Sequence, residues 1–115
     1  MDINAAVKAL SALSQETRLE TFRLLVRCGT DGLAAGEIAR VLGTPHNTLS
    51  SHLSILSNAG LVNSEREGRS IFYRIDLEGT RKLLAFLVED CCQGCPEMCS
   101  SILDSVLPDC CEPTT

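Results

Sequence analysis

Apolar side chains recur every three or four residues in the first part of the chain, which is the spacing of one face of an α-helix. Residues 3–13 carry such a stripe, formed by Ile3, Ala6, Val7, Leu10 and Leu13. A second stripe ends at Cys28-Gly29, where glycine suits the position just past a helix. Ser14 is a good N-cap for this second helix, and Glu16 places an acid in its first turn. The pattern predicts two consecutive helices.

A shorter helix and a longer one follow, with a tight connection between them. The spacing of apolar residues predicts a short helix from Glu37 to Leu42. A helix from Pro45 to Ala59 follows, with Thr44 as its cap and Pro45 at its first position. Two helices joined by so short a connection are typical of a helix-turn-helix.

The helix expected over 45–59 has two contrasting faces. At about 100° per residue, Leu49, Leu53 and Leu56 fall in one narrow stripe. Small polar side chains occupy or flank the opposite side: Asn47, Thr48, Ser50, Ser51, Ser54 and Asn58. Asn can bond adenine through two atoms, and Ser or Thr can reach bases or phosphates, so this face fits the major groove of DNA. The alternative is an ordinary serine-rich surface helix, because the helix has no Lys or Arg.

Two stretches rich in β-branched and aromatic residues, 61–65 and 70–75, predict a β-hairpin. Arg66-Glu67-Gly68-Arg69 would form its turn, with glycine where a positive φ is needed. A hairpin directly after a recognition helix is a wing, and Arg66 and Arg69 suit contacts to phosphates or to the minor groove. A solvated charged turn is the alternative. The predicted fold class is mainly α with a small β-hairpin, a winged helix-turn-helix.

The charges are segregated along the chain. The 115 residues, enough for one domain core, carry a net charge of −5. Residues 83–115 contain six acids and no Lys or Arg, whereas residues 1–82 contain ten basic and nine acidic side chains. A nearly neutral body permits DNA contact through a few placed arginines but excludes strong non-specific binding.

Several other classes of protein are not expected. The longest apolar run, residues 83–88, is far short of the roughly 20 residues of a membrane span. The N-terminus lacks the basic and apolar regions of a secretory signal, so we expect a cytoplasmic protein with no membrane partner. The chain has no glycine-rich phosphate loop and no Cys/His pair within one plausible site. We therefore expect a binding protein and not an enzyme, with no organic cofactor.

Cysteines divide the chain into two parts. Of the seven, only Cys28 lies in the body, and the other six are Cys91, Cys92, Cys95, Cys99, Cys110 and Cys111. Without a secretory signal they are expected to stay reduced and to serve metal or redox chemistry. We predict a DNA-binding and dimerisation domain over residues 1–90 and a cysteine-rich acidic sensing tail over residues 91–115.

The body resembles the ArsR/SmtB family of winged-helix metalloregulators over roughly residues 10–75. The similarity is carried by LSQETRL at 13–19, EIA at 37–39, LSSHL at 49–53, AGLV at 59–62, and REGR at 66–69 followed by Tyr73. The resemblance implies a homodimeric repressor whose first and last helices form the dimer interface, with the last helix over residues 78–90. It also implies that a metal or metalloid releases the protein from double-stranded operator DNA.

The two histidines are weak candidates for metal ligands. His46 and His52 flank the apolar stripe of the recognition helix and have no nearby cysteine or paired acid in sequence. A structural or phosphate-facing role is the favoured interpretation. Relatives that sense with cysteines in the helix-turn-helix or with His/Asp pairs on the last helix are not matched, because residues 33–48 lack cysteine and residues 78–90 lack histidine.

Sensing is therefore expected in the run Cys91-Cys92-Gln93-Gly94-Cys95-Pro96-Glu97-Met98-Cys99. Several thiols without histidine suit As(III), Sb(III) or Cd/Zn-type metals better than Ca or Mg. The run resembles arsenic repressors with a Cys-Cys…Cys site just past the last helix, which implies Cys91, Cys92 and Cys99 as ligands. Cys95 occupies a variable position of that pattern and is a further candidate. The expected inducer is As(III), with Sb(III) or trivalent methylarsenite as alternatives.

Other uses of these cysteines stay open. Cys92 and Cys95 form a Cys-x-x-Cys pair that could act as a thiol redox switch, although the βαβ context of a thioredoxin-like site is missing. Cys92, Cys95 and Cys99 with Cys110 or Cys111 could instead hold a structural zinc, and a Zn/Cd-responsive repressor is also open. The Cys110-Cys111 pair is either a weaker thiophilic site or part of a solvated tail. Cys28 is interpreted as a small buried hydrophobic residue.

Overall fold

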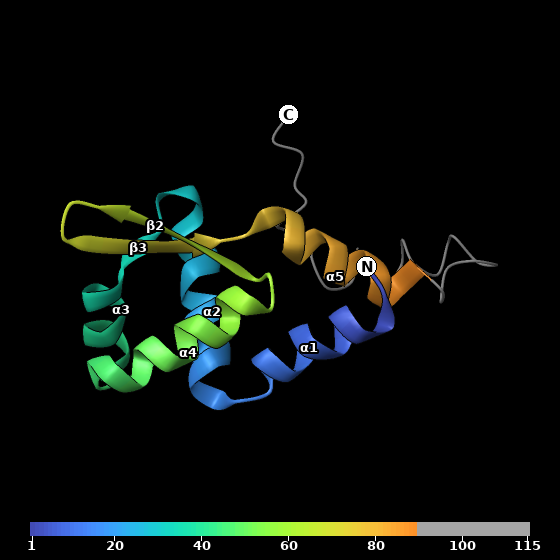
Figure 1. Cartoon of the computed structure of the whole chain (residues 1–115), viewed down its shortest axis with the longest axis horizontal. Coiled ribbons are helices and arrows are strands. Elements are labelled where there is room, and N and C mark those ends of the chain that lie inside the picture. The colour runs from blue at the N-terminus through green and yellow to red at the C-terminus, as the bar shows by residue number, and fades with distance from the viewer. Residues whose placement is uncertain (90–115) are drawn as a thin grey trace. The chain divides into compact units, whose positions relative to one another are not determined.

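The computed structural model describes residues 1–89. The elements along the chain are α1 (Ile3–Leu13), α2 (Glu16–Cys28), the 3₁₀ turn η1 (Gly29–Asp31), β1 (Leu33–Ala34), α3 (Ala35–Leu42), α4 (His46–Asn58), β2 (Val62–Glu67), β3 (Ser70–Ile75) and α5 (Leu77–Glu89) (Figure 1). Residues 1–83 form one compact unit, and a second unit begins at Leu84 within α5. Among the described helices, none is long and apolar enough to cross a membrane. The fold is mainly helical with a small sheet, as the sequence predicts.

The core of residues 1–83 is built around α4, which packs against α1, α2, α3 and β2. The leucine stripe predicted from the sequence is fully buried: Leu49, Leu53 and Leu56 each have 0% exposure. Leu25, Ile38 and Leu61 from neighbouring elements complete this centre. Burying a leucine contributes about 1.5–3 kcal/mol, so this stripe fixes the position of α4 and directs its other face outward.

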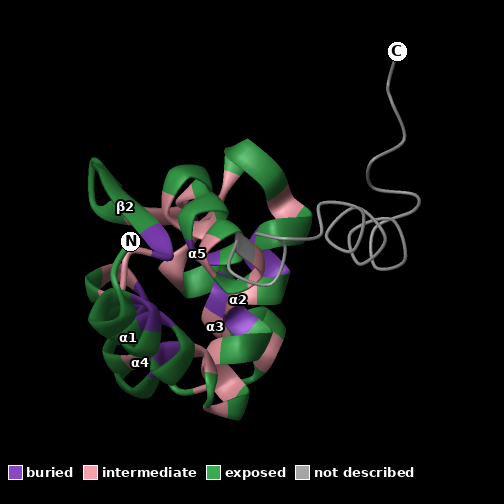
Figure 2. Cartoon of the chain, turned by 90° about the vertical axis from the view of Figure 1, so that its right-hand side faces the viewer, coloured by how far each residue is buried: buried purple, intermediate pink, exposed green. Residues whose placement is uncertain are grey.

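The first helix buries a different face from the one that its large apolar residues suggest. Ala6, Ala9 and Ala12 are at most 2% exposed, whereas Ile3, Val7 and Leu10 are 63%, 57% and 43% exposed. Figure 2 shows the buried positions as a band along one side of α1. The small alanine side chains let α1 approach α2 and α4 closely, so the large side chains of the same stripe are left on the outside.

Two predicted helix caps are corrected. Ser14 is the C-cap of α1, where its hydroxyl donates to the Ser11 carbonyl, and Gln15 caps α2 by accepting from the Arg18 amide. Thr44 does not cap α4 but belongs to the end of α3, where its amide bonds to the Ala39 carbonyl beyond a left-handed Gly43. Pro45 therefore lies at the N-cap position of α4, without a side-chain bond, and the helix begins at His46.

The sheet has three antiparallel strands in the order β1-β3-β2. The sequence predicts only the hairpin, and β1 was missed because two residues carry no periodic signal. Leu33 pairs with Tyr73 and Ala34 with Phe72. Gly32, just before β1, has φ +71°, and a Cβ there would lie 2.6 Å from the Tyr73 carbonyl oxygen. Glycine is thus needed at position 32 both for backbone conformation and for the close approach of β3.

The hairpin turn is shorter than predicted. The ladder continues to the pair Glu67 and Ser70, so the turn consists of Gly68 and Arg69 alone. Gly68 has φ +65° and no non-glycine residue in the described part of the chain has a positive φ, which is the pattern of a type II′ hairpin turn. The positive φ predicted for this glycine is confirmed, but Arg66 belongs to β2 and not to the turn. α3 also begins earlier than predicted, at Ala35 instead of Glu37.

Candidate nucleic-acid interface

The outward face of α4 presents short polar side chains. All five residues predicted to contact DNA from this helix are exposed: Asn47, Thr48, Ser50, Ser51 and Ser54. The Asn47 side chain accepts a 2.9 Å hydrogen bond from the Thr48 amide through Oδ1. This bond uses one acceptor site of the oxygen, which has two. The helix therefore combines a leucine face held in the core with a face of small donors and acceptors in solvent.

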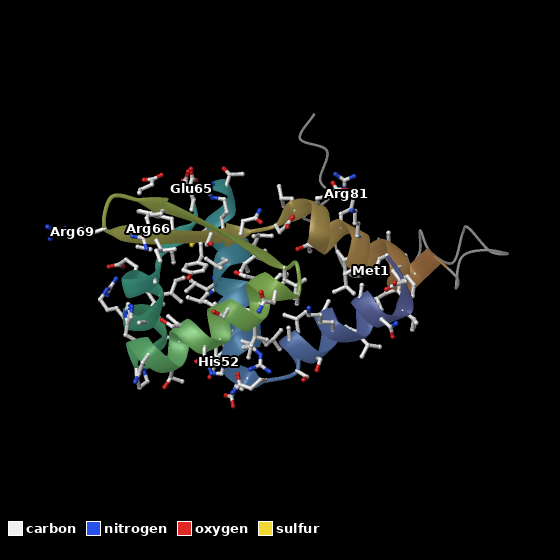
Figure 3. The ribbon with its side chains drawn as sticks, in the orientation of Figure 1. Met1, His52, Glu65, Arg66, Arg69 and Arg81 are labelled. Atoms are coloured by element: carbon white, nitrogen blue, oxygen red, sulfur yellow. The ribbon has the colours of Figure 1, made fainter. Side chains whose placement is uncertain are left out.

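The register of the hairpin separates its charges between the two faces of the sheet. Side chains alternate along a strand, so Arg66 and its partner Ile71 lie on the same face as the buried Val62 and Ile75. Glu65 and Glu67 lie on the opposite face, where Glu65 accepts a 2.9 Å bond from Arg74. Arg66 therefore projects on the helix side of the sheet while the acids project away from it. Figure 3 shows Arg66 and Arg69 toward the outer end of the hairpin.

A cleft of about 320 Å³ lies between the hairpin and the two helices α3 and α4. One wall consists of His46 and Ser50 from the first turns of α4, and another of the segment 34–36. The hairpin contributes Arg69, Ser70, Ile71 and Tyr73. Every polar side chain that lines the cleft can donate a hydrogen bond, and no Asp or Glu lines it. Such a lining suits an anion.

The charges on α3 are paired with each other. Arg40 and Glu37, one turn apart, form an exposed ion pair with a 2.6 Å contact. The hydrogen bond and charge of Arg40 hold the pKa of Glu37 below its ordinary value. Pairing leaves this helix close to neutral beside the donor face of α4, although an exposed pair of this kind adds little to stability.

Arg18 connects the last turn of α1 to the middle of α4. Its Nε donates a 2.7 Å bond to the Ala12 carbonyl, and its NH1 lies 3.3 Å from Nδ1 of His52. Figure 3 shows His52 on α4, on the side where α2 begins. Burial lowers the pKa of His52, and the nearby Arg18 charge lowers it further. This geometry favours a structural histidine with a neutral ring whose Nδ1 accepts from Arg18.

The candidate metal ligands lie outside the described residues. This applies to Cys91, Cys92, Cys95 and Cys99, as well as to Cys110 and Cys111. Within residues 1–89, no group of three or more His, Cys, Asp or Glu side chains could hold a metal ion. Cys28, at the end of α2, is a free thiol of intermediate burial, less buried than predicted.

Sequence reasoning missed two features of this region. The contact between Arg18 and His52 joins residues 34 positions apart, and only the occurrence of a cation and a histidine on adjacent helices pointed to it. The role of His46 as a wall of the cleft depends on β1, which carries no periodic signal, and on how α3 packs in three dimensions, which the periodicity of α3 does not report. The signal that was available is that His46 and Ser50 lie four residues apart, on the same side of a helix.

Comparisons with known proteins agree with the geometry. Residues 13–65 match a family described as a helix-turn-helix domain. The HTH-type transcriptional regulator YgaV of Escherichia coli is 35% identical over 68 residues, covering 56% of this chain and 69% of its own. A protein of Halobacterium salinarum described as a putative arsenical resistance operon repressor, ArsR, is 34% identical over 83 residues, covering 72% of this chain and 64% of its own.

A solved structure provides the same fold with substantial sequence identity. It is the homodimeric winged helix-turn-helix DNA-binding domain of Mb0332 from Mycobacterium bovis, described as a possible ArsR-family transcriptional regulator. The two chains are 31% identical and superpose with a TM-score of 0.63, covering 76% of this chain and 81% of the other. The winged helix-turn-helix is thereby confirmed, and the matched proteins are transcriptional regulators rather than enzymes.

Proposed function

Because the chain belongs to the ArsR family of winged helix-turn-helix transcriptional regulators, we propose that it is a metalloid-responsive repressor. In this proposal a homodimer binds operator DNA in the cytoplasm and leaves it when As(III) or Sb(III) binds thiolates of the tail. The observation that carries the proposal is the combination of an exposed polar face on α4, a hairpin with two arginines and a Cys-Cys…Cys run that begins two residues after the end of α5.

The DNA-binding part of the proposal is supported by the exposed face of α4 and by the hairpin. Asn47, Thr48, Ser51 and Ser54 are short enough to let the helix backbone approach base edges in the major groove. Arg66 and Arg69 would then contact the flanking backbone or the minor groove, since the hairpin directs its acids to its other face. Hydrogen bonds of the helix would provide specificity, and the arginines would provide salt-dependent affinity.

The dimer is supported by the outer faces of two helices. Val7 and Leu10 on α1 are about half exposed, as are Leu84 and Leu87 on α5. Exposed apolar patches of this kind mark protein interfaces, and the similar Mycobacterium bovis domain is described as homodimeric. A two-fold dimer would present two recognition helices about one DNA turn apart, roughly 34 Å, to a pseudo-palindromic operator.

The sensing part of the proposal is supported by the chemistry of the tail residues. As(III) forms three bonds to thiolates and keeps a lone pair, so it needs three cysteines in a compact segment. Cys91, Cys92 and Cys99 are proposed as these ligands, with Cys95 as the alternative third one. Closing the segment around the metalloid would shift the adjacent α5 and disfavour the DNA-bound spacing of the dimer. Such a coupling is typically about 1–3 kcal/mol and acts in both directions, so operator DNA would weaken As(III) binding equally.

The experiment is a titration of the complex between the reduced protein and its operator with arsenite, followed by fluorescence anisotropy of labelled DNA. Cys91→Ser, Cys92→Ser and Cys99→Ser are each expected to keep operator binding and to lose release. Cys28→Ser and the double change of Cys110 and Cys111 are matched controls that keep both. If Cys95→Ser abolishes release and Cys99→Ser does not, the third ligand is Cys95. If arsenite still releases the DNA from each of the four single variants at Cys91, Cys92, Cys95 and Cys99, the proposed metalloid site is contradicted.

Three alternative roles of the tail cysteines can be tested with the same purified protein. The Cys92 and Cys95 spacing favours either a redox pair or a zinc ligand pair. If thiol oxidation is the signal, diamide releases DNA without metalloid and a reductant restores binding. If zinc is structural, the purified protein contains about one zinc per chain and loses helicity with a chelator. A Zn/Cd-responsive repressor is recognised by release with these ions and not with arsenite.

A further inference from the structure

The cleft between the hairpin and α4, here called the wing cleft, is lined by small or apolar residues and by polar side chains of one kind. His46 and Ser50 form its helix side, and Arg69, Ser70 and Tyr73 form its hairpin side. Each of these side chains can donate a hydrogen bond, and none carries a negative charge at neutral pH. The wing cleft is therefore suited to an oxyanion.

The position of the wing cleft indicates which oxyanion it receives. This step rests on the DNA binding proposed above, with α4 in the major groove and the hairpin at the adjacent minor groove. Those two grooves are separated by the sugar-phosphate backbone of one strand, which must cross the gap between helix and hairpin. Figure 1 shows the hairpin tip, α3 and the beginning of α4 on the same side of the molecule, so the crossing strand passes over the cleft.

We propose that the wing cleft binds one backbone phosphate of each half-site, and that His46 and Ser50 set the register of the protein on DNA. The His46 ring and the Ser50 hydroxyl donate to the phosphate oxygens, and Arg69 adds positive charge from the turn. Ser50 is thereby a backbone contact and not a base-reading residue. Contacts of this kind fix position and orientation without reading sequence.

Two pairs on α4 with the same spacing provide the internal comparison. His46 and Ser50 are four residues apart and line the cleft. Asn47 and Ser51 are also four residues apart, lie about 100° further around the helix, and do not line the cleft. All four side chains belong to exposed residues, so their removal leaves the core intact. One pair is assigned to the backbone and the other to base edges.

The first experiment measures affinity for a duplex that the protein selects from a random library and for a scrambled duplex. The His46→Ala and Ser50→Ala double variant is expected to lose about tenfold for both duplexes, whereas the Asn47→Ala and Ser51→Ala double variant loses affinity only for the selected one. His46→Gln keeps a hydrogen-bond donor at position 46, so this variant is expected to bind both duplexes more tightly than the double variant does. Equal urea midpoints check that the variants are folded. The proposal is overturned if the His46→Ala and Ser50→Ala double variant changes the ratio of the affinities for the selected and scrambled duplexes. It is also overturned if the affinities of this variant equal those of the wild type.

The second experiment locates the phosphate by replacing single phosphates of the selected duplex with uncharged methylphosphonates. One position per half-site is expected to weaken the wild type and to have no effect on the His46→Ala and Ser50→Ala variant. If no such position exists, the wing cleft does not hold backbone phosphate. Inorganic phosphate is expected to weaken DNA binding no more than chloride at equal ionic strength, and a larger effect would assign the cleft to free phosphate instead. If the wild type selects no duplex from the library and does not bind the scrambled one, the DNA-binding function itself is refuted.

Discussion

The first helix and the recognition helix of this protein expose opposite kinds of side chain. α4 buries its leucines and presents Asn47 and Ser51 to solvent, whereas α1 buries alanines and presents Val7 and Leu10. Both helices pack against the same core, and they contact each other. The difference lies in what the outer face can bind, because small polar groups suit base edges and large apolar groups suit another protein surface.

This contrast shows that amphipathicity alone does not identify the buried face of a helix. In α4 the three leucines are the buried residues, whereas Ile55 is 40% exposed, so burial of the leucine stripe reproduces the sequence pattern. In α1 the close approach to α2 and α4 is made by small side chains, and the large ones remain outside. Single exposed apolar residues are ordinary, but several on one face of a helix, as on α1, form a patch that suits a partner surface.

The largest expected effect comes from the buried side of α4. Leu53→Ala removes a side chain with 0% exposure and is expected to cost about 2–5 kcal/mol of unfolding free energy. Ser54→Ala, at the exposed neighbouring position, is the matched control and should stay within about 0.5 kcal/mol. Urea unfolding followed by circular dichroism measures both. Similar costs for the two variants would mean that the faces of α4 are assigned wrongly.

The next effect concerns the two sides of α1. Ala9→Leu places extra volume at a position with 0% exposure and is expected to destabilise the protein by about 1–3 kcal/mol. Leu10→Glu, one residue further, is expected to leave the fold intact and to shift the protein from dimer to monomer in sedimentation equilibrium. Leu19→Glu on α2, where the leucine is also 43% exposed, is the control that keeps the dimer. A Leu10→Glu protein that remains dimeric removes α1 from the interface.

A smaller effect separates sequence reading from backbone attraction. Asn47→Ala is expected to weaken binding to the selected duplex by about tenfold, since a good base contact contributes about 1–3 kcal/mol of discrimination. Arg69→Ala should weaken binding to all duplexes and reduce the salt slope by about one. Anisotropy titrations over a series of salt concentrations measure both quantities. A salt slope that Arg69→Ala leaves unchanged is evidence against hairpin contact with DNA.

The smallest effect is a pH dependence through His52. Its pKa in the folded protein lies below the ordinary value of 6.5, so the unfolded chain binds a proton more readily than the folded one. Stability from this group is therefore complete above about pH 6.5 and decreases as the pH falls toward the folded pKa. The unfolding free energy of the wild type between pH 7.5 and 5.5 should fall more than that of His52→Gln. Parallel pH profiles for the two proteins would show that burial and the nearby Arg18 charge do not lower the pKa of His52 in the folded protein.

Much of the fold could be predicted because periodicity reports burial of large side chains. The leucines of α4 and the hairpin at Gly68 carry strong local signals, and both were located correctly. The caps at Gln15 and Pro45 were missed because several neighbouring residues could serve, and tertiary packing decides among them. Strand β1 was missed because its two residues acquire their role only by pairing with β3.

The close contacts between distant segments were beyond prediction for a similar reason. Gly79 lies in the first turn of α5, where a Cβ would overlap the carbonyl oxygen of Gly60. A glycine in a helical pattern looks unfavourable until its neighbour in space is known. The exposed polar residues of α4 and the arginines of the hairpin could be proposed from type and spacing, whereas the wing cleft required the three-dimensional arrangement. The roles of the tail cysteines stay predictions from chemistry and resemblance.

The apolar outer face of α1 has a consequence for dosage. If this face pairs two copies, the DNA-binding species forms from two chains, and its amount depends on the square of the monomer concentration when most chains are single. Halving the protein would then reduce the dimer about fourfold. The exposed Val7 and Leu10 would make occupancy of the operator respond more steeply than in proportion to how much protein the cell makes, before any inducer is present.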